Sequence, residues 1–298
     1  MQKIIIIVGP TASGKSALAI ELARKIGGEI ISADSRQVYK GLDIGTGKIT
    51  KREMKGVPHH LLDIASPTRM ITAHDFAIQA RKAIDDITAR TKTPVVVGGA
   101  GFYIDALVGR VALSTVPMDK KLRTRLMKKT PKQLFALLKR RDAARAIAIA
   151  KKNEFNNKHR LIRALEITHG TPTPYMESSE YSVLWLGIKP DMQELKEKIR
   201  ERLITRIKRG MIVEVQRLHK NGLSYKRMNE LGLEYRYLAL YLQKKITKEE
   251  VVERLSAKIW QYARRQVIYW KRNKDIRWDS LAALNKKKAA IVRDFLKR

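Results

Sequence analysis

A glycine-rich segment near the start of the chain has the composition of a phosphate-binding loop. Residues 9–16 read GPTASGKS, which fits the pattern G-x-x-x-x-G-K-[ST], and the apolar run Ile4–Val8 precedes them. Glycines let the backbone curl so that its N–H groups surround an anion, and Lys15 adds a full positive charge. We expect a phosphate chain to be bound here, with the Ser16 hydroxyl as a Mg²⁺ ligand. The expected contacts are Gly9, Thr11, Ala12, Ser13, Gly14, Lys15 and Ser16.

Asp34 is the candidate acid–base group. It follows the short apolar segment Glu29–Ser32, which predicts a strand, and open parallel sheets bind ligands at the carboxyl ends of their strands. Asp34 could therefore act as a general base or hold Mg²⁺ through water, and a structural role in its loop is equally open. The next predicted strand, Pro94–Val97, is followed by glycines. A motor-type NTPase would have an aspartate there to hold Mg²⁺ through water, so the sequence does not favour that class. The loop motif identifies a phosphate chain, not a reaction.

The balance of charge indicates a polyanionic partner. The 298 residues include 62 Lys and Arg against 29 Asp and Glu, a formal net charge of +33. Residues 111–298 hold 46 of the basic and 19 of the acidic side chains, a net +27. Charge of this size favours nucleic acid, because each cation that neutralises a phosphate releases a condensed counterion. It does not distinguish DNA from RNA, and a highly charged solubilising surface is the alternative.

Composition excludes several other classes of site. There is no cysteine, which rules out disulfides, thiolate zinc sites and cysteine nucleophiles. Apart from His59-His60 the histidines are scattered, so we expect no histidine metal cluster. No apolar run approaches the roughly 20 residues of a membrane span. We expect a cytoplasmic, monomeric protein with no membrane partner.

The order of predicted elements indicates an α/β core with a helical insertion. Strands and helices alternate over the first hundred residues, which predicts a parallel sheet covered by helices. Lys/Arg-rich helical segments follow from about Asp119 to His169, and a strand returns at Ser182–Ile188. Two long helices are expected over Glu194–Lys220 and Lys248–Arg272, and the lysine run 286–288 should be a solvated helix face. We predict a core of residues 1–116 and 183–298, with an all-helical subdomain at 117–182.

Six segments in this order resemble the tRNA dimethylallyltransferase family, also called tRNA isopentenyltransferase. They are GPTASGKS (9–16), SADSRQVYKGLDIGTGK (32–48), GVPHHLLDI (56–64), VVVGGAGFY (95–103), RLIRALEI (160–167) and QYARRQ (261–266). The resemblance implies a P-loop-kinase-like core with a helical insertion that contacts tRNA. It also implies transfer of a dimethylallyl group from dimethylallyl diphosphate to N6 of the adenosine 3′ of the anticodon, position 37, with Mg²⁺ as cofactor.

The resemblance also implies roles for individual residues. Asp34 would accept the N6 proton of the adenosine, and Arg202 would contact the diphosphate. The positions that match tRNA contacts are Ser35, Arg36, Gln37, Ala100, Arg123, Lys158, His159, Arg160, Leu161, Arg264, Arg265, Gln266 and Lys271. Tyr262 and Trp270 lie between these basic residues at helical spacing, for which core packing is the favoured interpretation.

The sequence departs from the family pattern next to the expected reaction centre. The family loop usually reads GGTGLY, with a threonine placed to hydrogen-bond the reacting groups, and this chain has Ala100 at that position. Losing one preorganised hydrogen bond commonly costs on the order of 10²-fold in rate. Another group must supply the hydrogen bond, or the enzyme is slow or altered in substrate.

Three other functions stay open at this stage. An adenylate isopentenyltransferase acting on free nucleotide would share the fold, but a small nucleotide needs no extended basic surface. A catalytically weakened RNA-binding P-loop protein would explain Ala100, although Asp34, Lys15 and Ser16 are all present. A small-molecule kinase would share the loop without explaining the charge. The motif also leaves open whether ATP competes with the donor for the loop.

Overall fold

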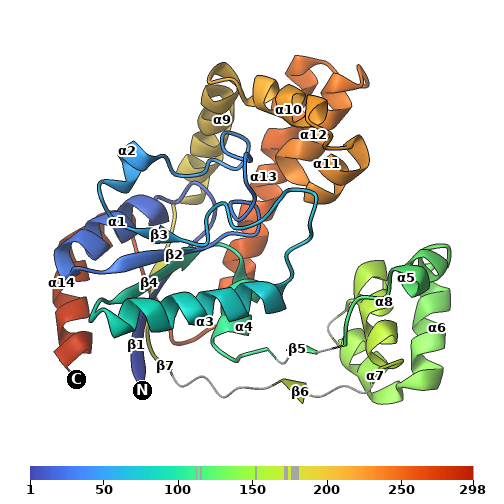
Figure 1. Ribbon diagram of the computed structural model, residues 1–298, viewed down its shortest axis with the longest axis horizontal. Helices are drawn as coiled ribbons and strands as arrows, with labels where there is room; N and C mark the ends of the chain where they lie inside the picture. The colour runs from blue at the N-terminus through green and yellow to red at the C-terminus, as the bar shows by residue number, and fades with distance from the viewer. Residues whose placement is uncertain (112, 115, 152, 171–173, 176–180, 298) are drawn as a thin grey trace. The chain divides into compact units, whose positions relative to one another are not determined.

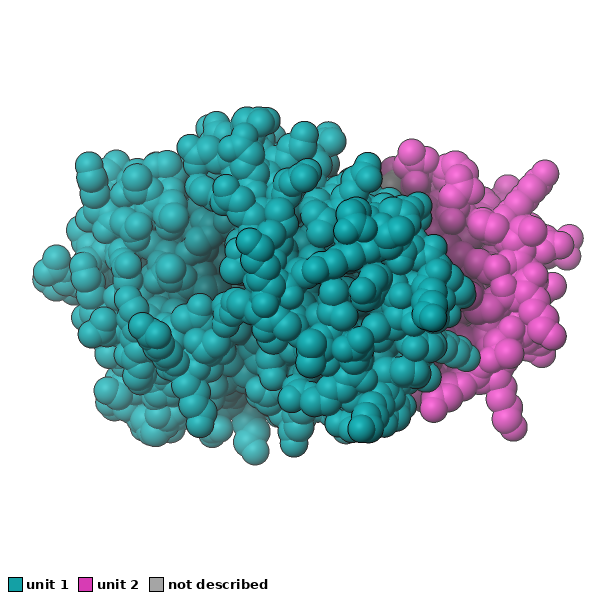
Figure 2. Space-filling model, turned by 90° about the horizontal axis from the view of Figure 1, so that it is seen from above, with its two compact units in different colours: residues 1–110, 179–298 teal, residues 111–178 magenta. Residues whose placement is uncertain are grey.

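The chain folds into two compact units, which Figure 2 shows in different colours. The computed structural model describes residues 1–298 except 112, 115, 152, 171–173, 176–180 and 298. The first unit comprises residues 1–110 and 179–298, and the second comprises residues 111–178. The predicted insertion, 117–182, overlaps the second unit with boundaries displaced by a few residues.

A six-stranded, entirely parallel sheet forms the centre of the first unit, in the order β3-β2-β4-β1-β7-β8 (Figure 1). The central strand β1 pairs with β4 on one side and β7 on the other, so that Ile5 lies opposite both Val95 and Leu184. The strands are β1 Gln2–Val8, β2 Glu29–Ala33, β3 His59–His60, β4 Pro94–Gly98, β7 Tyr181–Ile188 and β8 Arg277–Asp279. The predicted α/β class with a parallel sheet is confirmed.

Helices cover both faces of the sheet, which explains why β1 is apolar without alternation. Ile4 and Ile6 pack toward Phe76 and Trp270, whereas Ile5 and Ile7 pack toward Leu18. Strands of parallel sheets buried on both sides are continuous apolar runs for this reason. The helices involved are α1 Lys15–Ile26 and α14 Leu281–Lys297 on one face, and α3 Ala73–Ala89 and α4 Gly101–Leu107 on the other.

A helical layer with its own apolar core completes the first unit. The expected helix over Glu194–Lys220 is two helices, because Gly210 adopts a left-handed conformation with φ of 96° and interrupts it. The expected helix from Lys248 ends at Trp270, two residues early. The helices are α9 Met192–Lys208, α10 Met211–Lys220, α11 Tyr225–Leu231, α12 Leu233–Leu242 and α13 Lys248–Trp270, and a short α2 spans Lys51–Met54.

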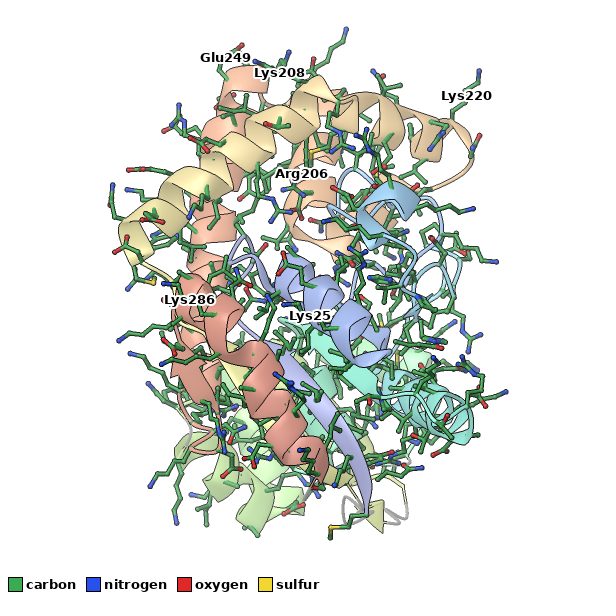
Figure 3. All side chains as sticks on the ribbon, turned by 90° about the vertical axis from the view of Figure 1, so that its left-hand side faces the viewer. Lys25, Arg206, Lys208, Lys220, Glu249 and Lys286 are labelled. Carbon is green, nitrogen blue, oxygen red and sulfur yellow. The ribbon has the colours of Figure 1, made fainter. Side chains whose placement is uncertain are left out.

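The lysine run on α14 is only partly solvated. Lys286 lies on the surface (Figure 3), but the side chain of Lys288 is 2% exposed. Its ammonium donates to Glu21 of α1 at 2.5 Å and to Asn285 at 2.7 Å. The expectation of a wholly solvated face was therefore wrong at Lys288, because its position on the helix faces α1.

The second unit is built from four helices around a small leucine-rich core. Leu134, Leu138 and Leu161 are fully buried there. A short antiparallel pair, β5 Leu113–Ser114 with β6 Pro174–Tyr175, joins the two ends of the unit, so its described part is not entirely helical. The helices are α5 Lys120–Met127, α6 Pro131–Arg141, α7 Ala143–Lys151 and α8 Lys158–Ile167. Among the residues described, no helix in either unit is long and apolar enough to cross a bilayer.

Candidate active site

The phosphate-binding loop connects β1 to α1 and is closely packed. Ala12 has φ of 63° and Gly14 has φ of 88°, both in the left-handed region. An added Cβ at position 14 would lie 2.7 Å from a terminal methyl of Leu281 in α14, so that side chain would have to move. Glycine is therefore favoured at position 14 chiefly by the backbone conformation. Helix α1 begins directly after it with no acidic residue in its first turn, so its positive end stays available to an anion.

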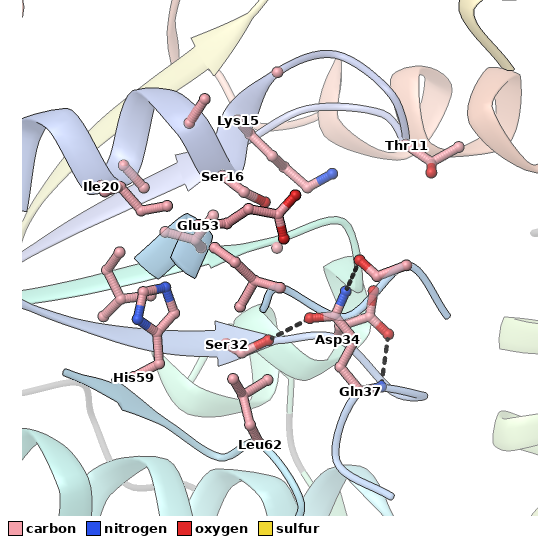
Figure 4. Close-up of a pocket in the computed structure, with 18 of the residues that line it drawn as sticks. Thr11, Lys15, Ser16, Ile20, Ser32, Asp34, Gln37, Glu53, His59 and Leu62 are labelled. Atoms are coloured by element: carbon pink, nitrogen blue, oxygen red, sulfur yellow. Dashed lines mark hydrogen bonds between the residues drawn. The ribbon is translucent and has the colours of Figure 1, made fainter. Parts of the chain in front are cut away.

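The loop lines a pocket of about 490 Å³ at the carboxyl ends of the strands (Figure 4). Charged and polar side chains reach it from several elements, among them Lys15, Asp34, Glu53 and Arg202. Apolar side chains line it as well, contributed by Ala19, Ile20, Ile30, Ile49, Leu62 and Val97. A pocket of this composition can accept a ligand with a highly charged group and a short hydrocarbon chain.

Lys15 extends into this pocket, where its ammonium donates to the carbonyl oxygen of Pro10 at 3.1 Å. Burial lowers the pKa of Lys15 to about 8; the negative charge of Asp34 opposes this shift, and the positive charge of Arg202 adds to it. A bound anion would offset the burial and favour the charged form. The lysine is thus poised to bind a phosphate.

Asp34 has a structural role in its loop and also lines the pocket. Its Oδ1 accepts hydrogen bonds from the backbone N–H groups of Arg36, at 2.8 Å, and Gln37, at 3.3 Å. In the part of the chain that the structure describes, its Oδ2 makes no hydrogen bond. The carboxylate is therefore fixed in direction by one oxygen while the other can accept a proton in the pocket.

The residues after Asp34 are held by short-range contacts. Gln37 also lines the pocket; it accepts from the Ser32 hydroxyl at 3.3 Å and donates to the Gly47 carbonyl at 3.5 Å. Arg36 donates to the Ser35 carbonyl at 3.4 Å, and both side chains are half-buried. The structure thus brings Gln37 to the pocket, while Ser35 and Arg36 are its neighbours in the chain and do not line it.

Ala100 lies next to this loop at the end of β4. Its N–H donates to the carbonyl of Ala33, the residue before Asp34, at 3.4 Å. It is also the N-cap residue of α4, with no side chain able to accept a capping hydrogen bond. The position is therefore adjacent to the candidate base, as the family pattern requires, and the threonine hydroxyl of that pattern is missing from it.

Two arginines of α9 approach the loop around Gly47 from the other side. Arg202 lines the pocket, and Arg206 donates to the carbonyl of Gly45 at 2.8 Å and pairs with Glu234 at 3.3 Å. Figure 3 shows Arg206 on the inner side of α9, while Lys208 points outward. The structure therefore places Arg202, the expected diphosphate contact, at the pocket together with Lys15.

Glu214 of α10 is a buried carboxylate that sequence reasoning missed. It accepts from the backbone N–H groups of Asp43, at 3.0 Å, Ile44, at 2.6 Å, and Gly45, at 2.9 Å. The hydroxyl of Tyr235 donates to it at 3.0 Å. The only signal in the sequence is an acidic residue between the apolar positions of its helix. Glu214 holds the loop that carries Gly47 toward the pocket.

Helix α13 presents different residues to the site and to solvent. The carboxamide of Gln266 is buried between the phosphate-binding loop and the end of β4. Arg264, Arg265 and Lys271 are exposed, and their side chains make no ion pair or hydrogen bond with the residues described. Trp270 is 1% exposed and packs against Trp185, so the core-packing interpretation is confirmed for it. Tyr262 is half-buried.

The residues of the second unit that are expected to contact RNA differ in whether their side chains are exposed and unpaired among the described residues. Arg123 pairs with Glu166 through two hydrogen bonds of 2.6 and 2.8 Å, and that carboxylate is 1% exposed. Arg160 pairs with Glu154. Leu161 is fully buried in the core of the unit, which leaves it no side-chain surface for RNA. Lys158 is half-buried and His159 is exposed, and neither side chain has a partner among the described residues.

The pocket offers oxygen ligands for a metal, not a preformed cluster. Within the described ranges no group of three or more His, Asp or Glu residues could hold an ion. Ser16, Asp34 and Glu53 all line the pocket, and hydroxyl and carboxylate oxygens suit Mg²⁺, which keeps several waters and uses substrate phosphates as ligands. The residues present therefore fit a hydrated Mg²⁺ that arrives with a phosphate-bearing ligand.

Comparisons with known proteins agree with one another. Residues 37–274 match the family model described as IPP transferase. Among curated relatives, tRNA dimethylallyltransferase 2 of Treponema denticola is 42% identical over 276 residues, covering 90% of this chain and 91% of the relative. The tRNA dimethylallyltransferase of Anoxybacillus flavithermus is 37% identical over 285 residues, covering 93% and 90%.

The solved structures that this chain resembles are of enzymes of the same kind. The tRNA isopentenylpyrophosphate transferase of Bacillus halodurans has a TM-score of 0.75 at 31% identity, with 100% of this chain and 97% of that chain covered. A eukaryotic dimethylallyltransferase acting on tRNA has a TM-score of 0.83 at 26% identity, with 100% of this chain and 80% of that chain covered.

Proposed function

Because the chain belongs to the IPP transferase family, we propose that it transfers a dimethylallyl group from dimethylallyl diphosphate to N6 of adenosine 37, 3′ of the anticodon, in tRNA. The family resemblance seen in the sequence segments is thereby confirmed. The observation that supports this reaction best is the combination in one pocket of a phosphate-binding loop, apolar side chains and a carboxylate with a free oxygen. We further propose that the protein acts as a monomer in the cytoplasm.

The donor would bind with its diphosphate at the loop. Lys15, Arg202 and the start of α1 would neutralise the diphosphate, with the backbone of residues 9–16 around it. The five-carbon chain would lie against apolar side chains of the pocket such as Ile20 and Ile30. Ser16 and Glu53 would hold a Mg²⁺ ion together with the diphosphate, and the ion would supply positive charge that stabilises the leaving group.

The transfer exchanges one bond for another at the allylic carbon. N6 of adenosine forms a bond to C1 of the dimethylallyl group while the C1–O bond breaks, and the electron pair leaves with the diphosphate. The Oδ2 of Asp34 accepts the proton that N6 loses, since Oδ1 is already occupied by the N–H groups of Arg36 and Gln37. Lys15 stabilises the charge that develops on the departing oxygen.

The target base must leave its stack to reach this pocket, as in other enzymes that modify a nucleobase. We propose that Arg264, Arg265 and Lys271 of α13 bind the RNA backbone, since they are exposed and unpaired within the described residues. Lys158 and His159 of the second unit would supply further contacts, whereas Arg123 and Arg160 would contribute less, because carboxylates already bind them.

The decisive experiment incubates the purified protein with dimethylallyl diphosphate, Mg²⁺ and an unmodified anticodon stem-loop. Mass spectrometry should detect one added prenyl unit on the adenosine after the anticodon. Modification of free AMP in place of the stem-loop would favour the adenylate isopentenyltransferase. RNA binding with no mass gain would favour a catalytically weakened protein and point to Ala100. Addition of ATP as a competitor tests whether nucleotide occupies the same loop.

A further inference from the structure

The carboxamide of Gln266 connects two loops that meet at the pocket. Its Oε1 accepts from the backbone N–H of Thr11 in the phosphate-binding loop, at 2.9 Å. Its Nε2 donates to the backbone carbonyl of Gly99 at the end of β4, also at 2.9 Å. An N–H group can only donate and a carbonyl can only accept, so both contacts fix the same orientation of the carboxamide. Gln266 is 6% exposed, so the carboxamide is largely shielded from solvent.

The surroundings of the carboxamide are closely packed. A Cβ added at Gly99 would lie 2.0 Å from the Gln266 nitrogen and 3.4 Å from the carbonyl oxygen of Gly9. While the carboxamide is in place, position 99 therefore has no room for any residue larger than glycine. Next along the chain, Ala100 lies beside the candidate base, so Gln266 lies between the loop for the diphosphate and the loop at the reaction centre.

The basic residues that precede Gln266 lie on the exposed side of the same helix. Arg264 and Arg265 are exposed, and neither contacts the phosphate-binding loop by any hydrogen bond among the described residues. The segment that matches an RNA contact in the family thus contains side chains in two different environments. The carboxamide already makes one hydrogen bond at each end, and the residue is 6% exposed, so its second N–H and second lone pair have little surface on which to meet a base.

We propose that Gln266 is a positioning residue for diphosphate binding and does not contact RNA. It holds the N–H of Thr11 and the Gly99 carbonyl so that the loop keeps its anion-binding shape before the donor arrives. Removing the carboxamide leaves both backbone groups unpaired in a buried site, which loosens the loop. The inference rests on the proposed function in taking diphosphate as the ligand of the loop.

The first test measures binding of inorganic diphosphate with Mg²⁺ in the absence of RNA, by calorimetry. Gln266→Met conserves volume and removes both hydrogen bonds, and should weaken diphosphate binding about five- to tenfold. Binding of the anticodon stem-loop without donor should stay within about twofold. Gln261 is exposed on the same helix, so Gln261→Met is the matched control and should change neither affinity. Arg265→Met should weaken only the stem-loop.

The opposite pattern would overturn the proposal. A loss of stem-loop affinity with unchanged diphosphate affinity in Gln266→Met would make the residue an RNA contact, and no change in either would leave it without a role. The wild-type prenyl-transfer assay is separate. Failure of wild-type protein to modify the stem-loop would contradict the proposed function, whereas the diphosphate measurement would still test Gln266.

A double-mutant cycle tests the same contact without depending on one variant. Gly99→Ala should displace the carboxamide and weaken diphosphate binding to a similar degree, because the new methyl group occupies its place. Gln266→Ala makes room for that methyl group. The double variant Gly99→Ala with Gln266→Ala should therefore bind diphosphate no more weakly than Gln266→Ala alone. Additive losses would show that the two positions act independently and would contradict the proposal.

Discussion

The pocket at the phosphate-binding loop and the outer face of α13 use charge in opposite ways. In the pocket each charged group is held individually: Lys15 is buried, and Asp34 is fixed by two backbone N–H groups. On α13, Arg264 and Arg265 are exposed and have no ion pair with any described residue. The first arrangement suits chemistry on one small group, and the second suits attraction of a long polyanion.

This difference indicates which part of the net charge of +33 is free to bind RNA. In the second unit, Arg123 and Arg163 both bind the buried Glu166, so part of its basic charge stabilises the fold. Changes in the pocket should therefore be large, specific for turnover or donor binding, and dependent on pH. Changes on exposed basic faces should be smaller for each residue, specific for RNA and dependent on salt.

The largest effect should come from Asp34→Asn. The amide oxygen of asparagine can still accept the two backbone hydrogen bonds, but the side chain can no longer take up a proton. Turnover should fall by about 10²- to 10⁴-fold while stem-loop affinity stays within about twofold. Asp85→Asn, an exposed carboxylate outside the pocket, is the control. Unchanged turnover in Asp34→Asn would show that Asp34 is not the base. The proposed difference between the pocket and α13 in the role of their charged groups would then fail.

The combined change Arg264→Ala and Arg265→Ala should weaken stem-loop binding about tenfold or more at physiological salt. Each lost phosphate contact should also reduce the slope of log affinity against log salt by about 0.7 to 0.9. Diphosphate affinity should not change, because neither side chain lines the pocket. Binding measured across a salt series checks this. An unchanged slope would mean that RNA binds elsewhere.

The pH dependence of the pocket should be set by Lys15. Because its pKa of about 8 is below the ordinary 10.5, the folded chain binds fewer protons than the unfolded chain between these values. Stability of the ligand-free protein should rise with pH across that window, while diphosphate affinity falls by at most about tenfold per pH unit above 8. Melting curves and calorimetry measure the two trends. Lys15→Arg should flatten both pH trends, because arginine stays charged over this range. Any pH dependence of affinity that remains would come from ionisation of the diphosphate itself.

Arg123 should affect stability before it affects RNA binding. Arg123→Ala leaves the buried Glu166 with the longer contact to Arg163 and the backbone N–H of Asp119, and should destabilise the second unit by about 2 kcal/mol. Lys158→Ala should do the reverse, with little change in melting temperature and a small loss of RNA affinity. Thermal melts of both variants, compared with their stem-loop affinities, decide the assignment. A stable Arg123→Ala protein that binds RNA poorly would contradict it.

The smallest effect should come from Ala100→Thr. The new hydroxyl could cap α4, which would stabilise the protein by about 1 kcal/mol. It would also stand beside Asp34, where it should raise turnover by a few-fold. Single-turnover rates together with a melting curve separate the two contributions. A loss of activity would show that the site has been rebuilt around alanine.

Local patterns in the sequence predicted the elements whose cause is local. The loop over residues 9–16, the buried strand before it and the strand over Pro94–Val97 all depend on neighbouring residues, and each was placed correctly. The break at Gly210 was missed, because helical apolar spacing continues on both sides of that glycine. The roles of Glu214 and Lys288 depend on partners far away in the chain, and no local pattern contains that information.

The candidate site shows the same limit at single residues. The motif identified Lys15 and Ser16 as pocket residues because the loop positions its own side chains. The family segment 261–266 identified a contact region, but not that Gln266 points toward the loop while Arg264 and Arg265 point to solvent. A matched segment predicts a function for a stretch of the chain. The burial of each side chain then indicates which residues of that stretch can perform it.

The position of β1 in the sheet has a consequence for synthesis of the protein. Ile4–Val8 precedes both of its neighbouring strands in the chain, and one of them, β7, begins only at Tyr181. A strongly apolar strand with one open edge must therefore wait until Tyr181–Ile188 has been synthesised. Such an edge is prone to pair with other chains, and contacts of long sequence separation form slowly. Yield in the cell should accordingly depend on translation speed and chaperone supply more than on the stability of the finished fold.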